Sequence, residues 1–165
     1  MGQTDIPLNQ IGIAQATDTA EFLYRNNIKI DKILTSTLER AKSTARIINT
    51  FYNVTILEDD GLREANFGVA EGQVGAYDDL YESWVLGTTP LNAENWEDFS
   101  TRVIQSINQY LDSKSKFLII AHGGVYSALS HNLGIRTIDI GNCIPYTFLP
   151  PNDSNNKWNI KQVVI

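Results

Sequence analysis

The sequence predicts an α/β fold in three layers, in which helices cover both faces of a mostly parallel sheet. Short apolar runs of strand length alternate with longer stretches in which apolar residues recur at helical spacing. With 42% hydrophobic and 19% charged residues, the composition is typical of a globular domain. A length of 165 residues therefore favours one domain over residues 1–165.

The first half of the chain supplies helices and strands in alternation. Asn9 is a favourable helix cap, and apolar residues then keep to one face as far as Asn26. Acidic residues 58–60 and Gly61 form a turn, which we interpret as a solvated face and not as a metal site. The predicted helices and strands of this half are 9–26, 32–36, 38–51 and 54–57.

The second half begins with a region rich in Gly, Asp and Tyr, residues 68–90, that we expect to be mostly loop. A helix starts at Asn95 or Glu94, and its apolar face is formed by Phe99, Val103, Ile107 and Leu111. The remaining predicted elements are a strand at 117–121, a helix behind it, and strands near 143–149 and 158–165 joined by a turn at 150–153. Cys143 is expected to pack inside the first of these late strands.

The segment FLIIAHGG, residues 117–124, is the most informative stretch. It reads as a buried strand that ends on His122, followed by two glycines and a helix, and such strand ends border the ligand crevice of open α/β sheets. Gly123 and Gly124 leave backbone N–H groups free to approach an anion at the helix start. The alternative is a buried His122 that is hydrogen-bonded to a neighbour.

Three further segments are candidates for the same crevice. Arg40 lies just past a strand end, in the first helical turn, and its planar fork matches phosphate; alternatively it pairs on the surface with Glu39 or Asp31. Glu64 lies in a glycine-punctuated loop and could donate a proton if burial raises its pKa, or it is an ordinary loop acid. The opening residues 2–9 either wrap a ligand or cap the first helix.

Composition excludes several function classes. A net charge of −6 without a basic stripe disfavours nucleic acid and anionic membranes, so an anionic substrate must be bound by local arginines. No apolar run is long enough to span a membrane, and the N-terminus lacks the regions of a signal peptide. One cysteine and two histidines leave no metal cluster and no internal disulfide, so we expect no cofactor and a cytoplasmic location.

Four segments in order, GQTDIPLNQIGIAQA, TSTLERAKSTA, LREANFGVAEG and AHGG, resemble the histidine phosphatase superfamily, which includes the phosphoglycerate mutases. The resemblance implies a phosphoglycerate mutase-like fold, a phosphorylated small molecule or inorganic phosphate as ligand, and chemistry through a phosphohistidine. By position, Arg40 resembles a phosphate-pocket arginine, His122 the second pocket histidine and Glu64 the proton donor. Gly2, Gln3 and Thr4 resemble the stretch that closes over the rest of the substrate.

The family begins with a strand ending in Arg-His-Gly, which carries the nucleophilic histidine, whereas this sequence starts at Met1 just before the matching stretch. His131 has no such context and does not replace that histidine. We therefore expect an N-terminally truncated domain whose first strand is missing, inactive or nearly so, with a small phosphatase as its ancestor. Three alternatives stay open. The chain is an active phosphatase or mutase whose recorded sequence is too short, a non-catalytic phosphate-binding module, or a structural or interaction fragment. Ala70 and Ser127 also depart from common family residues, which leaves the substrate open.

The family analogy places the absent strand well inside the sheet. Its loss would leave neighbouring strands with unpaired N–H and C=O groups, which can pair with another chain. We therefore expect homo-oligomers formed through exposed sheet edges.

Overall fold

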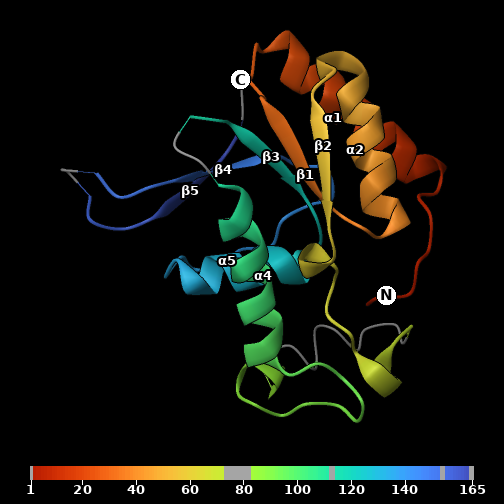
Figure 1. Ribbon diagram of the computed structural model, residues 1–165, viewed down its shortest axis with the longest axis vertical. Helices are drawn as coiled ribbons and strands as arrows, with labels where there is room; N and C mark the ends of the chain where they lie inside the picture. The colour runs from red at the N-terminus through yellow and green to blue at the C-terminus, as the bar shows by residue number, and fades with distance from the viewer. Residues whose placement is uncertain (1, 73–82, 112–113, 153–154, 164–165) are drawn as a thin grey trace.

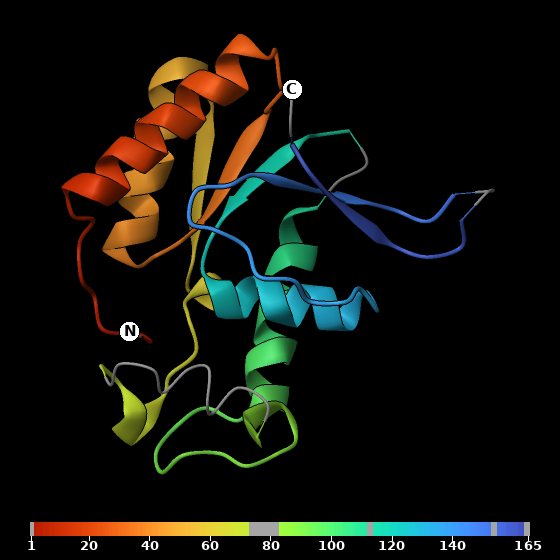
Figure 2. The same ribbon diagram turned by 180° about the vertical axis from the view of Figure 1, so that it is seen from behind.

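The computed structural model describes residues 2–72, 83–111, 114–152 and 155–163, and it confirms the three-layer α/β architecture. Helices α1 and α2 cover one face of a parallel sheet, and α4 and α5 lie on the other (Figures 1 and 2). The sheet has the order β2-β1-β3, so β1 is its central strand.

The three strands are β1 (Lys32–Ser36), β2 (Thr55–Asp59) and β3 (Phe117–Ile120). Ile33 of β1 is paired with Ile56 and Leu118, and it packs toward α1 and α2, whereas the next residue, Leu34, packs toward α4 and α5. Successive strand residues point to opposite faces, so one apolar run fills both halves of the core. This explains why the strands show unbroken apolar runs in the sequence.

Helices α1 (Gln10–Arg25) and α2 (Glu39–Tyr52) begin in different ways. The Asn9 side chain caps α1 by accepting a hydrogen bond from the Gly12 N–H at 2.9 Å, as the sequence predicts. Leu38 gives α2 no side-chain cap, and Asp5 Oδ1 accepts the Glu39 N–H at 2.7 Å instead. The N-terminal segment is therefore attached to the start of α2.

The other face holds α4 (Trp96–Tyr110), α5 (Gly123–Asn132) and two short 3-10 helices, η1 (Asp60–Leu62) and η2 (Gly68–Ala70). Asn95 caps α4 by accepting the Asp98 N–H at 2.8 Å. The core beneath α4 is aromatic, and the Trp84 ring meets the Trp96 ring edge-on at 5.1 Å between centroids.

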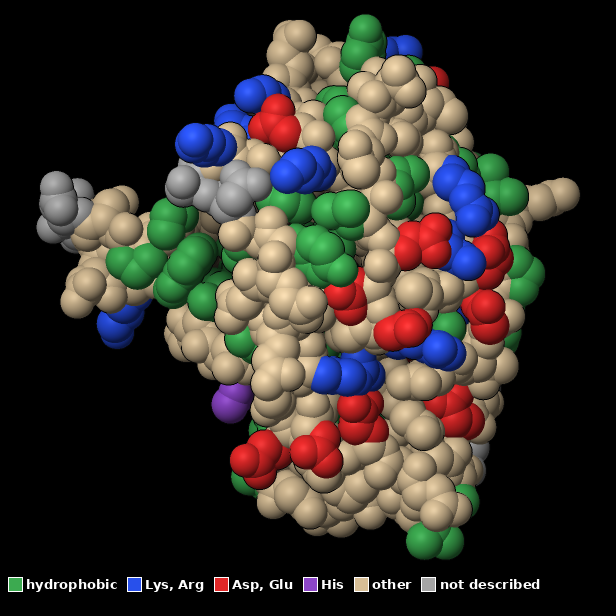
Figure 3. Space-filling model, in the orientation of Figure 1, with side chains coloured by type: hydrophobic (Ala, Val, Ile, Leu, Met, Phe, Trp, Pro, Cys, Tyr) green, Lys and Arg blue, Asp and Glu red, His purple; other side chains and the backbone are tan. Residues whose placement is uncertain are grey.

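A second sheet stands apart from the first. It consists of β4 (Tyr146–Leu149) and β5 (Asn159–Gln162), which pair antiparallel with each other. All four residues of β3 are only half-buried, whereas four of the five in β1 are buried. Hydrophobic side chains gather on the β4–β5 side of the surface in Figure 3.

Several expected boundaries are wrong. Leu111 follows α4 with extended backbone and is 53% exposed, so it leaves the apolar face formed by Phe99, Val103 and Ile107. Cys143 precedes β4 in the left-handed region, with φ of 57°, and lies outside the strand. Helix α5 includes both glycines, and β2 extends to Asp59. Parts of the expected loop at 68–90, of the turn at 150–153 and of the last strand lie outside the described residues.

Among the helices described, none combines the length and the apolar character that crossing a bilayer requires.

Candidate functional site

The candidate site forms where β1 and β3 end side by side. The two strands are parallel neighbours, so the residues after Ser36 and after Ile120 meet at the same edge of the sheet. Arg40 follows β1 in the first turn of α2, and His122 follows β3 as the residue before α5. The structure therefore brings together two candidates that lie 82 positions apart in the sequence.

His122 is half-buried, and its Nε2 lies 2.8 Å from Ser36 Oγ. Burial, the largest cause, and the positive charges of Arg40, Arg102 and Arg63 together lower the pKa of His122 to about 3. The imidazole is therefore neutral near pH 7. The Ser36 hydroxyl also accepts the Leu38 N–H at 3.2 Å, which ties the histidine to the start of α2.

Arg40 contacts the N-terminal segment and not the acids expected as surface partners. Its Nη1 donates to the Thr4 carbonyl oxygen at 2.9 Å and its Nη2 to the Gly2 carbonyl oxygen at 2.8 Å. Glu39 pairs instead with Lys42 and Arg46, and Asp31 pairs with Lys29. The alternative interpretation, a surface ion pair of Arg40 with Glu39 or Asp31, is therefore wrong. Burial lowers the pKa of Arg40, but the guanidinium remains a cation.

Glu64 is buried, with 9% of its surface exposed, and burial raises its pKa although two backbone N–H groups donate to it. These donors are Ala65 N at 2.9 Å and Gly124 N at 3.1 Å. The raised pKa extends the pH range over which this carboxyl group is protonated, and the protonated form is the one that can donate a proton.

The two glycines at the start of α5 have different roles. A Cβ at Gly124 would overlap the Glu64 carboxylate, so the missing side chain lets the acid approach the helix. The expectation that the Gly124 N–H is free for an anion is wrong, because it donates to Glu64. Gly123 is exposed, with open space where a Cβ would stand.

Residues 2–4, which we call the strap, run between Arg40 and Glu64. The Gln3 side chain donates from Nε2 to the Glu64 carbonyl oxygen at 3.1 Å, while Gly2 and Thr4 accept from Arg40. The strap is further held by Glu71. Every candidate named from the sequence thus lies in this part of the molecule.

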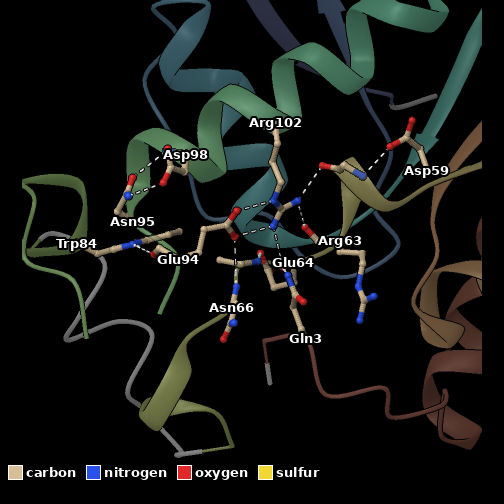
Figure 4. A network of polar contacts seen from close by, with 12 residues as sticks. Gln3, Asp59, Arg63, Glu64, Asn66, Trp84, Glu94, Asn95, Asp98 and Arg102 are labelled. Carbon is tan, nitrogen blue, oxygen red and sulfur yellow. Dashed lines mark hydrogen bonds and ion pairs between the residues drawn. The ribbon is translucent and has the colours of Figure 1, made fainter. Parts of the chain in front are cut away.

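The loop that carries Glu64 is fixed by Arg102 of α4 (Figure 4). Arg102 forms a bidentate pair with Glu94, at 2.6 Å and 2.8 Å. The remaining N–H groups donate to the carbonyl oxygens of Gly61, Arg63 and Glu64 at 2.8 to 3.1 Å. One guanidinium therefore satisfies three loop carbonyls next to the buried acid.

Sequence reasoning missed Ser36 and Arg102. Ser36 was visible only as one of several hydroxyl residues at the end of β1, and its partner His122 is 86 positions away. Arg102 lies on an amphipathic helix, eight positions from Glu94, where a surface ion pair is the ordinary reading. Within the described ranges, no group of His, Cys, Asp and Glu side chains is arranged to hold a metal ion.

Comparison with solved structures supports the fold. Mycobacterial glucosyl-3-phosphoglycerate phosphatase in complex with inorganic phosphate superposes with a TM-score of 0.80 at 21% identity, covering 98% of this chain and 88% of that one. The α-ribazole phosphatase from Shigella flexneri gives a TM-score of 0.75 at 23% identity, covering 98% and 86%.

Sequence comparison identifies the family. Phosphatase PhoE of Bacillus subtilis, itself uncharacterized, is 38% identical over 131 residues, or 78% of this chain and 65% of that protein. A probable phosphoglycerate mutase, GpmB of Yersinia pestis, is 32% identical over 158 residues, or 86% and 73%. The chain thus spans about two thirds of the length of such relatives. The family model of the histidine phosphatase superfamily (branch 1) matches residues 1–145, and the chain belongs to this superfamily.

Proposed function

We propose that residues 1–165 form one domain that binds phosphate monoesters or inorganic phosphate at the crevice between β1 and β3. In this proposal Arg40 and His122 contact the phosphoryl oxygens, and Glu64 is the acid that protonates a leaving oxygen. The strap and the N–H of Gly123 border the same crevice. The proposed ligand is a small phosphorylated molecule, and we propose no binding of nucleic acid, membrane or cofactor. The proposed location is the cytoplasm.

The observation that carries the proposal is the convergence of a cation, a neutral imidazole and a raised-pKa acid. The charge of Arg40 acts on both His122 and Glu64, so the three groups lie within electrostatic reach of one another. The guanidinium has more N–H donors than the two strap carbonyl oxygens use, and its planar fork suits phosphate. A solved structure with the same fold contains inorganic phosphate, which agrees with this ligand class.

We further propose that this polypeptide alone turns over phosphate esters slowly or not at all. Phosphohistidine chemistry needs an imidazole in line with the leaving oxygen. His122 is hydrogen-bonded to Ser36, and His131 lies exposed on the last turn of α5 with its ring edge-on to Trp96 at 5.7 Å. These two are the histidines of the sequence. The family resemblance gives neither of them the position of the nucleophile.

Isothermal titration calorimetry with inorganic phosphate tests the binding proposal. Arg40→Ala should weaken binding about 10- to 100-fold, because it removes charge-assisted hydrogen bonds to an anion. Arg46→Ala is the matched control, since Arg46 lies on the same helix, is exposed and pairs with Glu39. Equal affinity in Arg40→Ala and wild type would overturn the proposal.

An assay with p-nitrophenyl phosphate tests the second proposal on the same protein. We expect release of nitrophenol at the rate of a blank without protein. Robust turnover that disappears in His122→Asn would show that residues 1–165 hold a complete catalytic site and would contradict us.

We propose self-association of this chain through the outer edge of β3, which pairs with no strand among the residues that the structure describes. Half-burial of all four β3 residues and the separate β4–β5 sheet support it, since a parallel strand is ordinarily covered on both faces. Ile144, just before β4, and Leu149, the last residue of β4, add apolar surface, with 41% and 40% of their surface exposed.

A further inference from the structure

The Glu71 carboxylate accepts several hydrogen bonds from the strap. Its Oε1 accepts the Gln3 N–H at 2.9 Å, and its Oε2 accepts the Thr4 hydroxyl at 2.9 Å and the Thr4 N–H at 3.3 Å. The backbone of the strap contributes two of these three donors, so the contact fixes the course of the chain as well as one side chain.

The same carboxylate also reaches the loop that carries the buried acid. Glu71 Oε1 accepts the Phe67 N–H at 3.0 Å, three residues beyond Glu64. Burial would by itself raise the pKa of Glu71, but the hydrogen bonds from Phe67, Gln3 and Thr4 outweigh it and leave the pKa below its ordinary value. The ionised form is therefore the one that holds the strap.

The strap in turn orients Arg40. Both terminal nitrogens of the guanidinium donate to strap carbonyl oxygens, those of Gly2 and Thr4. Gly2 is buried and has φ of +49°, and a Cβ there would overlap the Glu71 carboxylate. The chain therefore passes Glu71 at a distance that only glycine allows, in a backbone region that other residues rarely adopt.

We propose that Glu71 is a positioning residue of the phosphate site, which holds the strap against Arg40 and so fixes the guanidinium for the phosphoryl group. The strap runs between Arg40 and Glu64, which in the proposed function would protonate the leaving oxygen. The organic part of a bound ester would therefore lie next to the strap, and Glu71 would influence which substituents the site accepts. This inference rests on the proposed function, because it assumes that Arg40 binds phosphate.

The test compares Glu71→Gln and Glu71→Ala with Glu58→Gln, a matched change at an exposed glutamate of β2. Calorimetry measures the affinity for inorganic phosphate and for phenylphosphonate, which carries an organic group and resists hydrolysis. We expect Glu71→Ala to lose about tenfold in phosphate affinity, the effect of one charge-assisted hydrogen bond, and to change the ratio of the two affinities severalfold. Glu71→Gln keeps one acceptor oxygen and should restore part of the affinity, while Glu58→Gln should match wild type.

Nuclear magnetic resonance supplies a readout that a general loss of stability would not give. In wild type, the amide signals of Gln3, Thr4 and Phe67 should shift together with pH at the lowered pKa of Glu71, and this transition should vanish in Glu71→Gln. Gly2→Ala should disturb the same signals while leaving the carboxylate in place.

The outcomes separate the two proposals. If wild type binds no phosphate but the three amide signals shift with the titration of Glu71, the proposed function is wrong. The contact by which Glu71 holds the strap is then still supported. If phosphate binds and Glu71→Ala changes neither the affinity ratio nor the strap signals, the positioning role is overturned.

Discussion

Glu64 and His122 illustrate how burial acts on an acid and on a base in one crevice. Burial disfavours the charged form of each group, so the pKa of Glu64 rises and the pKa of His122 falls to about 3. Both side chains are therefore uncharged over a common range of pH. In this pH range Glu64 adds no negative charge near Arg40, and of the carboxylates that act on Arg40 only Asp5 and Glu71 remain.

Binding of sulfate, a dianion, should therefore weaken as pH rises through the raised pKa of Glu64. Ionised Glu64 repels the anion, whereas protonated Glu64 does not. Glu64→Gln should remove this part of the pH dependence and keep binding strong at higher pH, as measured by calorimetry from pH 5 upward with Glu58→Gln as control. A decline in Glu64→Gln that parallels wild type would assign the effect to another group.

His122 should make the protein less stable in acid. Its pKa is about 3 in the folded state against an ordinary 6.5, so between these values the unfolded chain binds more protons than the folded one. The free energy of unfolding then rises with pH across this window and is lost on acidification. Urea unfolding at several pH values should show a smaller slope in His122→Asn than in wild type. His131→Asn, a change at the exposed histidine, should keep the full slope.

Among the helices, α4 does most to hold the loop of Glu64 in place. Arg102→Ala would leave Glu94, with 17% of its side chain exposed, without its ion-pair partner. It would also remove the Arg102 donors to the carbonyl oxygens of Gly61, Arg63 and Glu64, of which the last keeps the Gln3 side chain as a donor. We expect a loss of about 3 kcal/mol in the free energy of unfolding, as for other broken ion pairs of low exposure. Arg102→Lys should recover less than half, because an ammonium cannot reproduce the planar fork. A loss below about 1 kcal/mol, the range of exposed pairs, would contradict this role.

The elements were predictable wherever the signal is local. The Asn9 cap, the strand at 32–36 and the helical face from Phe99 to Ile107 depend on neighbours within a few positions. Helix α5 begins earlier than expected because two consecutive glycines look like a turn. The second of them, Gly124, is explained by its contact with Glu64, which no local pattern shows.

The candidate site residues were predictable from the sequence, whereas the residues that hold them in place were not. Arg40, Glu64 and His122 carry chemistry that their residue types and positions indicate. The bonds that hold them, such as Ser36 with His122 or Gln3 with Glu64, join positions 61 to 86 apart, which no local pattern specifies.

For the whole molecule, the free edge of β3 predicts association. Size-exclusion chromatography with light scattering should give a mass above that of one 18.5 kDa chain, and the mass should fall on dilution. Unpaired strand edges drive such contacts, and β3 is apolar and half-buried. A stable, compact monomer at all concentrations would count against the proposal.

The division into two sheets has a consequence for how the molecule opens. A pair of short strands that bonds to no other sheet is marginal by itself, whereas β1 is bonded on both sides. Deuterium should therefore enter the amides of β4 and β5 well before those of β1, through local fluctuations that leave the crevice intact. Unfolding would then begin at β4 and β5, and the sheet β2-β1-β3, at whose edge the candidate site lies, would unfold last.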